Sequence, residues 1–248
     1  MKLDLIKPAI FSQFEGVQCF FSKANRQLTN RTTGAIEGLH LGLFSHEDSI
    51  SVKENYSLLF DNIGWGDAHL AVAKQVHGNR VLIVQEPGVY PDCDGLVTKK
   101  VDLALGIQVA DCAAVVLYEP EERIAAVLHA GWRGAVSGIL VEGIHSIESL
   151  GGNASKIVAY ISPCISLENF EVGLEVAKLF PDSFCDYINF DKPHVDLNGY
   201  IVWQLTSEGV PLNHIESSNK CTFADTQFYS YRRERENAGR MLSLIKLI

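Results

Sequence analysis

Residues 124–150 read IAAVLHAGWRGAVSGILVEGIHSIESL and join two segments of different periodicity. The first, Ile124–His129, is an almost continuous apolar run of the kind expected in a strand that is covered on both faces. The second, Gly134–Leu150, repeats apolar residues at the i, i+3, i+4 spacing of a helix with one buried face, and Gly151 and Gly152 would end it. A buried strand that leads directly into an amphipathic helix predicts an α/β protein.

Similar patterns recur on both sides of this segment. Apolar runs predict further strands at Val17–Phe21, His69–Ala73, Val81–Gln85, Leu96–Thr98, Leu103–Val109, Ala113–Tyr118, Ile157–Ser162 and Tyr187–Phe190. Weaker helical patterns cover Ser51–Ile63, Glu171–Phe180, Ile201–Glu208 and Ala238–Ile248. Because several strands follow one another without a helix between them, the expected fold is α/β (α+β), with a mixed β-sheet flanked by helices. No repeat or linker divides the 248 residues, so a single domain over 1–248 is expected.

The composition restricts the class of protein. Hydrophobic residues make up 47% of the chain, which is enough for a substantial core. The formal net charge of −9 disfavours binding to nucleic acid, because the modest basic cluster of Arg232, Arg233 and Arg235 is interrupted by acidic residues. A small anion such as phosphate remains compatible with that cluster. No signal-peptide core or membrane-spanning apolar run is found, so we expect a cytoplasmic protein that does not bind membranes. No feature of the sequence indicates an oligomeric state.

Cysteine usage and one long polar segment narrow the expectation further. The six cysteines include no Cys-x-x-Cys pair, which excludes a zinc ribbon and a dithiol redox motif. In a cytoplasmic chain most of them are expected to be buried thiols. The polar segment Ser22–Glu37 is too irregular for a strand or a helix, and we expect it to form a surface loop of the kind that often borders a site.

Three residues with metal-binding side chains lie at or next to the ends of predicted strands: His77, Cys112 and His129. Two imidazoles and a thiolate form a three-ligand set that leaves one zinc position open for water or substrate, as in catalytic sites. The three residues are too far apart in the sequence for a local clip, so the fold would have to bring them together. On spacing alone, the simpler interpretation of a turn histidine, a core thiol and a strand-end histidine is favoured.

Arg133 and Asp111 are the first candidates for roles beside this site. Gly131 and Gly134 flank Arg133 between the strand and the helix, where backbone N–H groups and the guanidinium could bind an anion. A tight turn with Trp132 packed beneath it is an equally good interpretation of that segment. Asp111 is next to the candidate thiolate and could carry a proton if it is poorly solvated, although an aspartate at a strand end more often caps a turn.

Several short motifs together carry a resemblance to a known family. They are Gln75-Val76-His77-Gly78, Asp94-Gly95-Leu96-Val97-Thr98, Ala110-Asp111-Cys112, His129-Ala130-Gly131-Trp132-Arg133-Gly134, Ser162-Pro163-Cys164-Ile165 with Phe170-Glu171-Val172-Gly173, and Phe228-Tyr229-Ser230-Tyr231-Arg232-Arg233 with Gly239-Arg240. In these motifs the chain resembles the YfiH-type family, also labelled laccase-domain or polyphenol oxidase proteins. The similarity runs in order from about residue 17 to the C-terminus.

The resemblance implies a cytoplasmic, single-domain α/β enzyme. Its implied activity is that of a multifunctional purine nucleoside phosphorylase with adenosine deaminase activity, acting on adenosine, inosine and methylthioadenosine. It further implies a metal, usually zinc, held by His77, Cys112 and His129. Laccase activity with copper and the correction of peptidoglycan precursors are attached to the same family and remain alternatives.

The chain departs from the family pattern around the expected substrate rim. Phe21-Ser22-Lys23-Ala24-Asn25-Arg26 stands where Phe-Ser-Thr-Arg-x-Gly-Gly is usual, which leaves Arg26 or Arg31 to replace the missing arginine. His40 stands where asparagine is usual before Leu41-Gly42. The implied metal ligands are therefore intact while the rim is altered, and substrate preference transfers less directly than metal binding.

In the mechanism that we expect, zinc at the three ligands polarises the nucleophile, which is water for deamination and phosphate for phosphorolysis. Arg133 and one of Arg232, Arg233 or Arg240 would hold the phosphate. Asp111 would carry the proton. Purine nucleosides and phosphate are the expected partners.

Other functions remain open at this point. Multicopper oxidases use His-x-His pairs, and none of the eight histidines forms one. A metal-free cysteine hydrolase would use Cys112 as the nucleophile and His129 as its base. A binding module without catalytic activity is the simplest alternative, and a peptidoglycan-precursor editing hydrolase could coexist with any of these.

Overall fold

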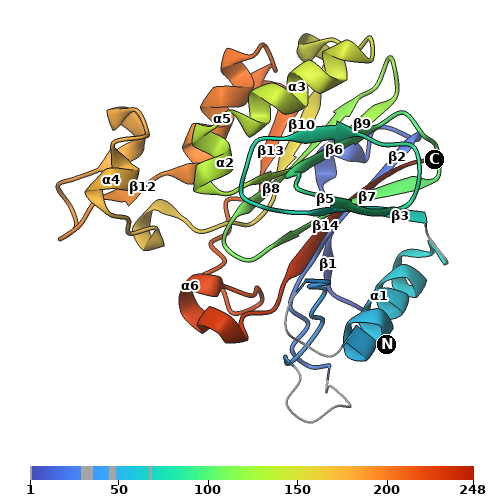
Figure 1. Ribbon diagram of the computed structural model, residues 1–248, viewed down its shortest axis with the longest axis horizontal. Helices are drawn as coiled ribbons and strands as arrows, with labels where there is room; N and C mark the ends of the chain where they lie inside the picture. The colour runs from blue at the N-terminus through green and yellow to red at the C-terminus, as the bar shows by residue number, and fades with distance from the viewer. Residues whose placement is uncertain (1, 29–35, 45–48, 67–68) are drawn as a thin grey trace.

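The computed structural model describes residues 2–28, 36–44, 49–66 and 69–248. Two six-stranded sheets lie face to face, with helices on their outer sides (Figure 1). Each sheet combines parallel and antiparallel strand pairs. The predicted α/β class is confirmed, with two mixed sheets in place of the single sheet expected. The extent of one domain over 1–248 stays a prediction.

The first sheet has the strand order β1-β2-β14-β7-β3-β5. Its strands are β1 (Leu5–Ile6), β2 (Val17–Ser22), β14 (Met241–Leu247), β7 (Leu103–Val109), β3 (His69–Lys74) and β5 (Gly88–Pro91). Strand β14 pairs antiparallel with both β2 and β7, whereas β3 pairs parallel with β7 and with β5. The C-terminal strand therefore lies in the middle of a sheet that the N-terminal strands begin.

The second sheet has the order β13-β10-β8-β9-β6-β4. Its strands are β13 (Ile215–Ser217), β10 (Val158–Ile161), β8 (Ala113–Glu119), β9 (Ile124–Ala130), β6 (Gly95–Thr98) and β4 (Val81–Ile83). A separate two-stranded sheet is formed by β11 (Cys185–Asp186) and β12 (His194–Val195). The register of β8 and β9 places Ala114 opposite His129.

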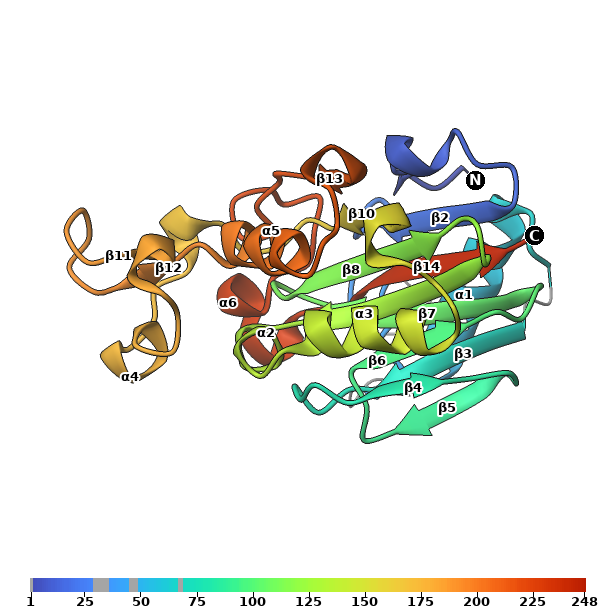
Figure 2. The ribbon, with the colours of Figure 1, turned by 90° about the horizontal axis from the view of Figure 1, so that it is seen from above.

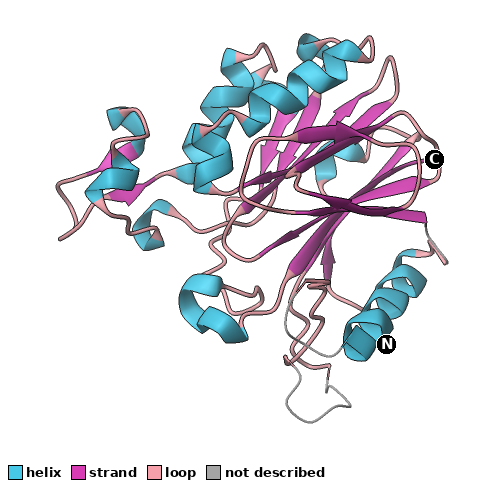
Figure 3. Ribbon diagram, viewed as in Figure 1, coloured by secondary structure: helices cyan, strands magenta, loops and turns pink. Residues whose placement is uncertain are grey.

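The described helices lie outside the two sheets (Figure 1). They are α1 (Ser49–Ile63), α2 (Trp132–Val136), α3 (Ile139–Ser149), α4 (Leu174–Ala177), α5 (Leu197–Ser207) and α6 (Tyr231–Glu234). Short 3₁₀ turns occupy Ala9–Phe11, Ala154–Lys156, Leu167–Asn169, Asp182–Phe184, Leu212–His214 and Arg235–Asn237. Helices α3 and α5 lie on one side of the sheets and α1 on the other, while α4, β11 and β12 project from the body (Figures 2 and 3).

The core between the two sheets is built from alternate residues of their strands. Phe21 of β2, Leu105 of β7 and Ile245 of β14 lie in one buried cluster with residues of the opposite sheet. The residues of the opposite sheet include Val127 of β9 and Tyr160 of β10, and all five side chains are fully buried. Because both faces of each sheet are covered, their strands appear in the sequence as nearly continuous apolar runs.

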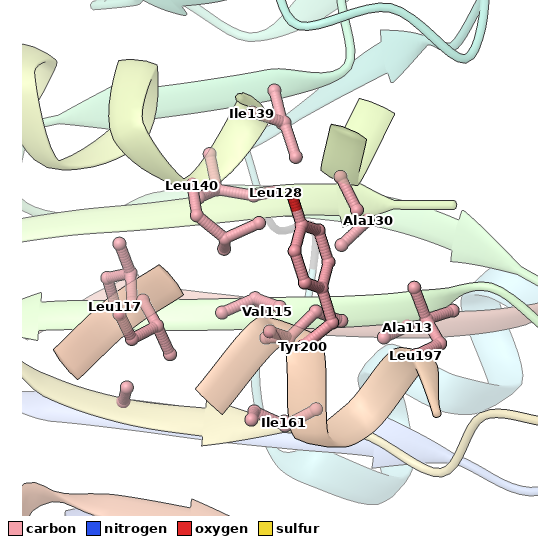
Figure 4. Close-up of a cluster of buried hydrophobic side chains, with 14 of the residues drawn as sticks. Ala113, Val115, Leu117, Leu128, Ala130, Ile139, Leu140, Ile161, Leu197 and Tyr200 are labelled. Carbon is pink, nitrogen blue, oxygen red and sulfur yellow. The ribbon is translucent and has the colours of Figure 1, made fainter. Parts of the chain in front are cut away.

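A second buried cluster lies between the second sheet and helices α3 and α5 (Figure 4). Val115 of β8 and Leu128 of β9 belong to it together with Leu140 of α3 and Tyr200 of α5. A Cβ on Gly143 of α3 would lie 2.4 Å from a methyl carbon of Leu128. The glycine therefore allows α3 to lie close against β9, the strand that leads to the candidate site.

The helix predicted over Ala238–Ile248 is wrong, because Met241–Leu247 form strand β14. Leu242 and Leu244 lie in a buried cluster with residues of α1, whereas Ile245 lies between the two sheets. A strand that is buried on both faces has no polar face. Its apolar run cannot be distinguished by periodicity from a buried helical segment.

Two further expectations are corrected by local backbone geometry. The predicted helix Gly134–Leu150 is interrupted at Gly138, whose left-handed backbone (φ 87°) separates α2 from α3. The strand predicted over Tyr187–Phe190 is wrong. The Asp186 carboxylate accepts hydrogen bonds from two following backbone N–H groups, and this interaction turns the chain at that point.

The strand predicted over Leu103–Val109 is found with the same bounds as β7, and the remaining predicted elements are found with altered bounds. The helix expected over Glu171–Phe180 is reduced to α4. Helix α5 begins before the predicted Ile201, because the Asp196 side chain caps it by accepting the N–H of Gly199 at 2.9 Å. Of the loop predicted over Ser22–Glu37, residues 29–35 lie outside the described part, and the described residues after Ser22 form neither helix nor strand.

Among the described helices, none combines the length and the apolar character needed to cross a lipid bilayer.

Candidate metal centre and adjoining cavity

His77, Cys112 and His129 come together at one edge of the two sheets. His77 follows β3, Cys112 directly precedes β8, and His129 lies near the end of β9. Their candidate ligand atoms all lie within 4.8 Å of one another. The two imidazole rings meet nearly edge to face, with 4.8 Å between their centroids and 75° between their planes. The fold thus supplies the convergence that the sequence spacing could not.

A buried carboxylate, Asp94, holds two of these residues in place. Its Oδ1 accepts hydrogen bonds from Nδ1 of His129 at 2.8 Å and from the backbone N–H of His77 at 2.9 Å. Its Oδ2 accepts the N–H groups of Val76 at 3.1 Å and Gly78 at 2.8 Å. Because Nδ1 of His129 is engaged, Nε2 is the atom left to bind a metal.

Asp94 also stabilises an unusual backbone conformation. His77 has a positive φ of 62°, which is uncommon for a residue other than glycine. Burial would raise the pKa of Asp94, but hydrogen bonds from His129 and from the backbone of Gly78 and Val76 keep that pKa below its usual value. The carboxylate therefore stays charged and keeps the turn around His77 in place.

Cys112 and His129 shift each other's pKa values. Burial alone would raise the pKa of the Cys112 thiol, but His129 and His77 bring it down to about 6. Burial alone would lower the pKa of His129, but Cys112 and Asp94 raise it to about 9. Cys112 is therefore a thiolate at neutral pH, which is the form that binds metals.

Gly131 provides the space that this cluster needs. A Cβ at this position would lie 2.8 Å from Sγ of Cys112 and 3.4 Å from Cδ2 of His77. The same turn approaches the His77 loop again at Gly134, where a Cβ would lie 2.7 Å from the carbonyl oxygen of Gly78. Gly131 and Gly134 therefore allow the chain to pack closely around the candidate ligands.

The three candidate ligands lie in the wall of a cavity of about 520 Å³. Its other lining residues come from the strand ends, from α2 and α6, and from the segments around Gly42 and Ile165. They are Gly42, Phe44, Gln75, Gln108, Val109, Ala110, Asp111, Trp132, Arg133, Ile165, Phe170, Tyr231, Arg232 and Arg240. Asp111 is the one carboxylate among these lining residues, whereas three arginines are present.

Three of the four predicted arginines reach this cavity with hydrogen-bond donors still available. The guanidinium of Arg133 stacks 4.3 Å from the Trp132 ring and donates to no residue that the structure describes. Among the described residues, the Arg232 guanidinium uses only Nη2, which donates to the carbonyl of Glu171 at 2.9 Å. Within the same part of the chain, the Arg240 guanidinium uses only Nη1, which donates to two carbonyls of its own segment.

The structure does not bring Arg233 to the cavity wall. Its Nη1 donates to the carbonyls of Thr222 and Phe223, and its Nη2 to the carbonyl of Phe228. Its Nε and Nη2 both donate to the Glu234 carboxylate. Every guanidinium nitrogen is thus engaged within the protein, which fits a role in holding the loop around α6 together. Arg26 is likewise engaged, by the same Glu234.

Asp111 lies beside Cys112 with both carboxylate oxygens occupied. Oδ1 accepts the hydroxyl of Thr222 and Oδ2 accepts the backbone N–H of Arg232, each at 2.6 Å. The residue has a positive φ of 79° and is largely buried. Its position permits the predicted proton-carrying role, while its contacts show that it also fixes the start of α6.

A family model described as multi-copper polyphenol oxidoreductase laccase matches residues 21–248. The chain belongs to this family. Among its relatives, a purine nucleoside phosphorylase of Mycobacterium tuberculosis is 33% identical over 231 residues, covering 89% of this chain and 91% of the relative. The adenosine deaminase RL5 of an unknown prokaryotic organism is 30% identical over 257 residues, covering 96% and 95% of the two chains.

Two solved structures share the fold of this chain. YfiH of Bacillus licheniformis superposes with a TM-score of 0.88 at 25% identity, covering 96% of this chain and 94% of that one. YlmD of Geobacillus stearothermophilus gives a TM-score of 0.88 at 25% identity, covering 95% and 93%. The family resemblance inferred from the motifs is therefore confirmed.

Several residues of this laccase-family site were not given a role by sequence reasoning. Asp94 belongs to the motif Asp94-Gly95-Leu96-Val97-Thr98. Its position directly before a buried strand is the sequence feature that could have indicated a role. Gln75 and Gln108 also line the cavity. The Gln75 side chain donates Nε2–H to the carbonyl of Gln108 at 2.8 Å, and its Oε1 accepts the backbone N–H of Gln108 at 3.0 Å. Ile165 belongs to a motif that carries the family resemblance, whereas no local pattern marks Phe44, which reaches the cavity wall only through the tertiary fold.

Proposed function

We propose that this protein is a metal-dependent purine nucleoside phosphorylase that also deaminates adenosine. The observation that carries the proposal is the joint presence, in one cavity, of a His-Cys-His cluster and three arginines with unused donors. The activities named for the phosphorylase and deaminase relatives support the same assignment. Methylthioadenosine and inosine are further proposed substrates, and the proposed location is the cytoplasm.

The residues present fit a zinc ion. Two imidazole nitrogens and one thiolate match the ligands zinc prefers, and three protein ligands leave a fourth position for a small molecule. The hydrogen bond from His129 to Asp94 is the outer contact that commonly orients a metal-bound histidine. When bound, zinc would supply a Lewis acid beside the substrate. Copper is the alternative that the family description suggests.

The arginines supply the charge that phosphate requires. Arg133, Arg232 and Arg240 can present two or more N–H groups to one anion, and such charge-assisted bonds are the strong ones. In phosphorolysis a phosphate oxygen forms a bond to C1′ of the ribose while the bond from C1′ to the purine nitrogen breaks. Asp111 is the proposed carrier of the proton that the departing base takes up.

Deamination uses the same cavity without phosphate. The oxygen of water forms a bond to C6 of adenine, and the exocyclic nitrogen leaves as ammonia. Asp111 lies next to Cys112 and can pass the proton from water to the leaving nitrogen. The apolar side chains of Phe44, Ile165 and Phe170 offer the purine ring a surface on which to pack.

The test is to incubate protein of known metal content with adenosine, with and without phosphate, and to identify the products by mass. Adenine with ribose 1-phosphate only when phosphate is present, and inosine without it, are the expected products. Both should disappear with a chelator and return with zinc. A protein that contains its metal and turns over none of the nucleosides would contradict the proposal.

The same experiment separates the rival functions. A metal-free cysteine hydrolase, which the low pKa of Cys112 would suit, should keep its activity after chelation. A phenol oxidase should require copper and consume oxygen. A peptidoglycan-precursor editing hydrolase should release an amino acid from precursor substrates, whether or not nucleosides are processed.

A further inference from the structure

His40 is buried beside the cavity, although it is not one of the candidate metal ligands. Only 1% of its surface is exposed, and it lies two residues before the lining residue Gly42. Its Nδ1 accepts the backbone N–H of Arg240 at 2.9 Å. The N–H of Leu41 donates to the carbonyl oxygen of Arg240 at 3.1 Å. Both main-chain polar groups of Arg240 are therefore held by two consecutive residues from a distant part of the sequence.

His40 is itself held through both its main chain and its ring. Asn55 of α1 donates its side-chain N–H to the carbonyl of His40 at 2.9 Å. The ring lies edge to face against Tyr229, with 6.3 Å between centroids and 89° between planes. A Cβ on Gly42 would lie 2.4 Å from Cε1 of His40 and 3.0 Å from Cγ of Arg240. The histidine thus has little freedom to move, and neither has the arginine it contacts.

Arg240 stands where a fixed orientation matters. Its guanidinium lines the cavity, and the main chain at Arg240 leads directly into β14. Nη1 donates to the carbonyls of Ala238 and Gly239, while Nε and Nη2 donate to no residue in the part of the chain that the structure describes. Burial lowers the pKa of Arg240, whereas the nearby Cys112 and Asp111 raise it. The free donors therefore lie within electrostatic range of the candidate metal centre.

We propose that His40 is a positioning residue that orients Arg240 toward the phosphate of the phosphorolysis reaction. This inference rests on the proposed function. Only a neutral imidazole can accept the Arg240 N–H at Nδ1. Burial and the charge of Arg240 lower the pKa of His40 to about 4, so the acceptor is present throughout the neutral range. Asparagine could make the same contact, because its Oδ1 is an acceptor at the same distance along the side chain as Nδ1 of histidine.

The test compares His40→Leu with His40→Asn in the metal-loaded protein. Loss of one buried acceptor and of the arginine's fixed position should raise the KM for phosphate about tenfold in His40→Leu. The kcat for deamination, which uses no phosphate, should change less than about twofold. His40→Asn should restore a KM close to that of the original protein. His145→Leu, at an exposed position on α3, is the matched control and should leave both reactions unchanged.

The outcomes distinguish a failure of this inference from a failure of the proposed phosphorylase function. If the original protein shows no phosphate-dependent product, both fail. If it does, and His40→Leu keeps an unchanged KM for phosphate, or loses deamination equally, His40 does not position Arg240 for phosphate. If His40→Leu fails to fold, Gly42→Ala replaces it, because the added methyl displaces the same imidazole and should also raise the KM for phosphate. An unchanged KM in Gly42→Ala would overturn the inference.

Discussion

Nδ1 of His129 donates a hydrogen bond of 2.8 Å to Oδ1 of Asp94, and both side chains are buried. The same carboxylate accepts three backbone N–H groups from the segment around His77. One buried charge therefore sets the positions of two candidate ligands that are distant in the sequence. The candidate metal centre depends on Asp94 as much as on the ligands themselves.

Replacing Asp94 with asparagine should weaken metal binding. One side-chain oxygen would become an NH₂ group facing N–H donors, so the His77 turn and the His129 ring would both lose their anchor. We expect a loss in zinc affinity of about 10–100-fold, measured by competition with a chromophoric chelator. Asp92→Asn, at an exposed position two residues earlier, is the matched control. Equal affinities in the two variants would show that Asp94 does not orient the ligands.

Zinc binding at pH 7.5 should release a proton. In the metal-free protein Cys112 is already a thiolate, because its pKa is about 6, whereas His129 is protonated, because its pKa is about 9. A metal must displace that proton to bind Nε2, so affinity should rise with pH up to about 9. Below about pH 6 the thiolate is also protonated, and affinity should fall more steeply.

Calorimetry in buffers of different ionisation enthalpy measures this proton release directly. In Cys112→Ala, which lacks one of the three candidate ligands and should not retain zinc, adding zinc should release no proton. Binding with no proton release in the original protein at pH 7.5 would contradict the assigned ionisation of the pair.

Gly131→Ala should disturb the candidate centre without a strained backbone. Gly131 has a φ of −73°, which alanine adopts readily, but the new methyl group would lie 2.8 Å from Sγ of Cys112. We expect metal content to fall while the circular dichroism spectrum and thermal midpoint of the metal-free protein change little. If the variant keeps full metal content after dialysis, the thiolate does not occupy the position described.

The packing of β9 against α3 provides a test of stability. Leu128 is fully buried in the cluster that also holds Leu140 (Figure 4), and it packs against Gly143. Leu128→Ala should therefore lower the free energy of unfolding by about 2–5 kcal/mol. Urea denaturation of the metal-free protein measures the change. Ile188→Ala, at a side chain that is 90% exposed, should cost less than about 0.5 kcal/mol. Equal effects would contradict the described core.

The sequence predicts the elements whose patterns are local. The strand within Ile124–His129 and most of the following helix were recognised because their apolar residues have a clear period or a continuous run. The apolar run that forms β14 predicts a helix because the two faces of the strand are covered by different neighbours, α1 and the opposite sheet. That information exists only in the tertiary structure.

The site divides in the same way. The three candidate ligands could be identified from their motifs, but their convergence could not. Cys112 and His129 meet through the pairing of β8 with β9, and His77 comes from the end of β3 in the other sheet. Arg233 resembles Arg232 in the sequence, yet its guanidinium is used by loop carbonyls and Glu234. In the sequence, His40 is notable only because it departs from the family pattern. The residue that it contacts, Arg240, lies 200 positions later in the chain. Which polar group faces a cavity is decided by such long-range contacts.

The central claim is that Cys112, with His77 and His129, holds the metal on which both nucleoside reactions depend. The most direct measurement is the metal content of Cys112→Ala, determined together with its phosphorolysis and deamination rates. Cys185→Ala is the control, because Cys185 is a free cysteine that does not line the cavity. We predict about one zinc ion per chain in the original protein and the control. In Cys112→Ala zinc should be lost together with both activities. Full metal content and full turnover in Cys112→Ala would contradict the account.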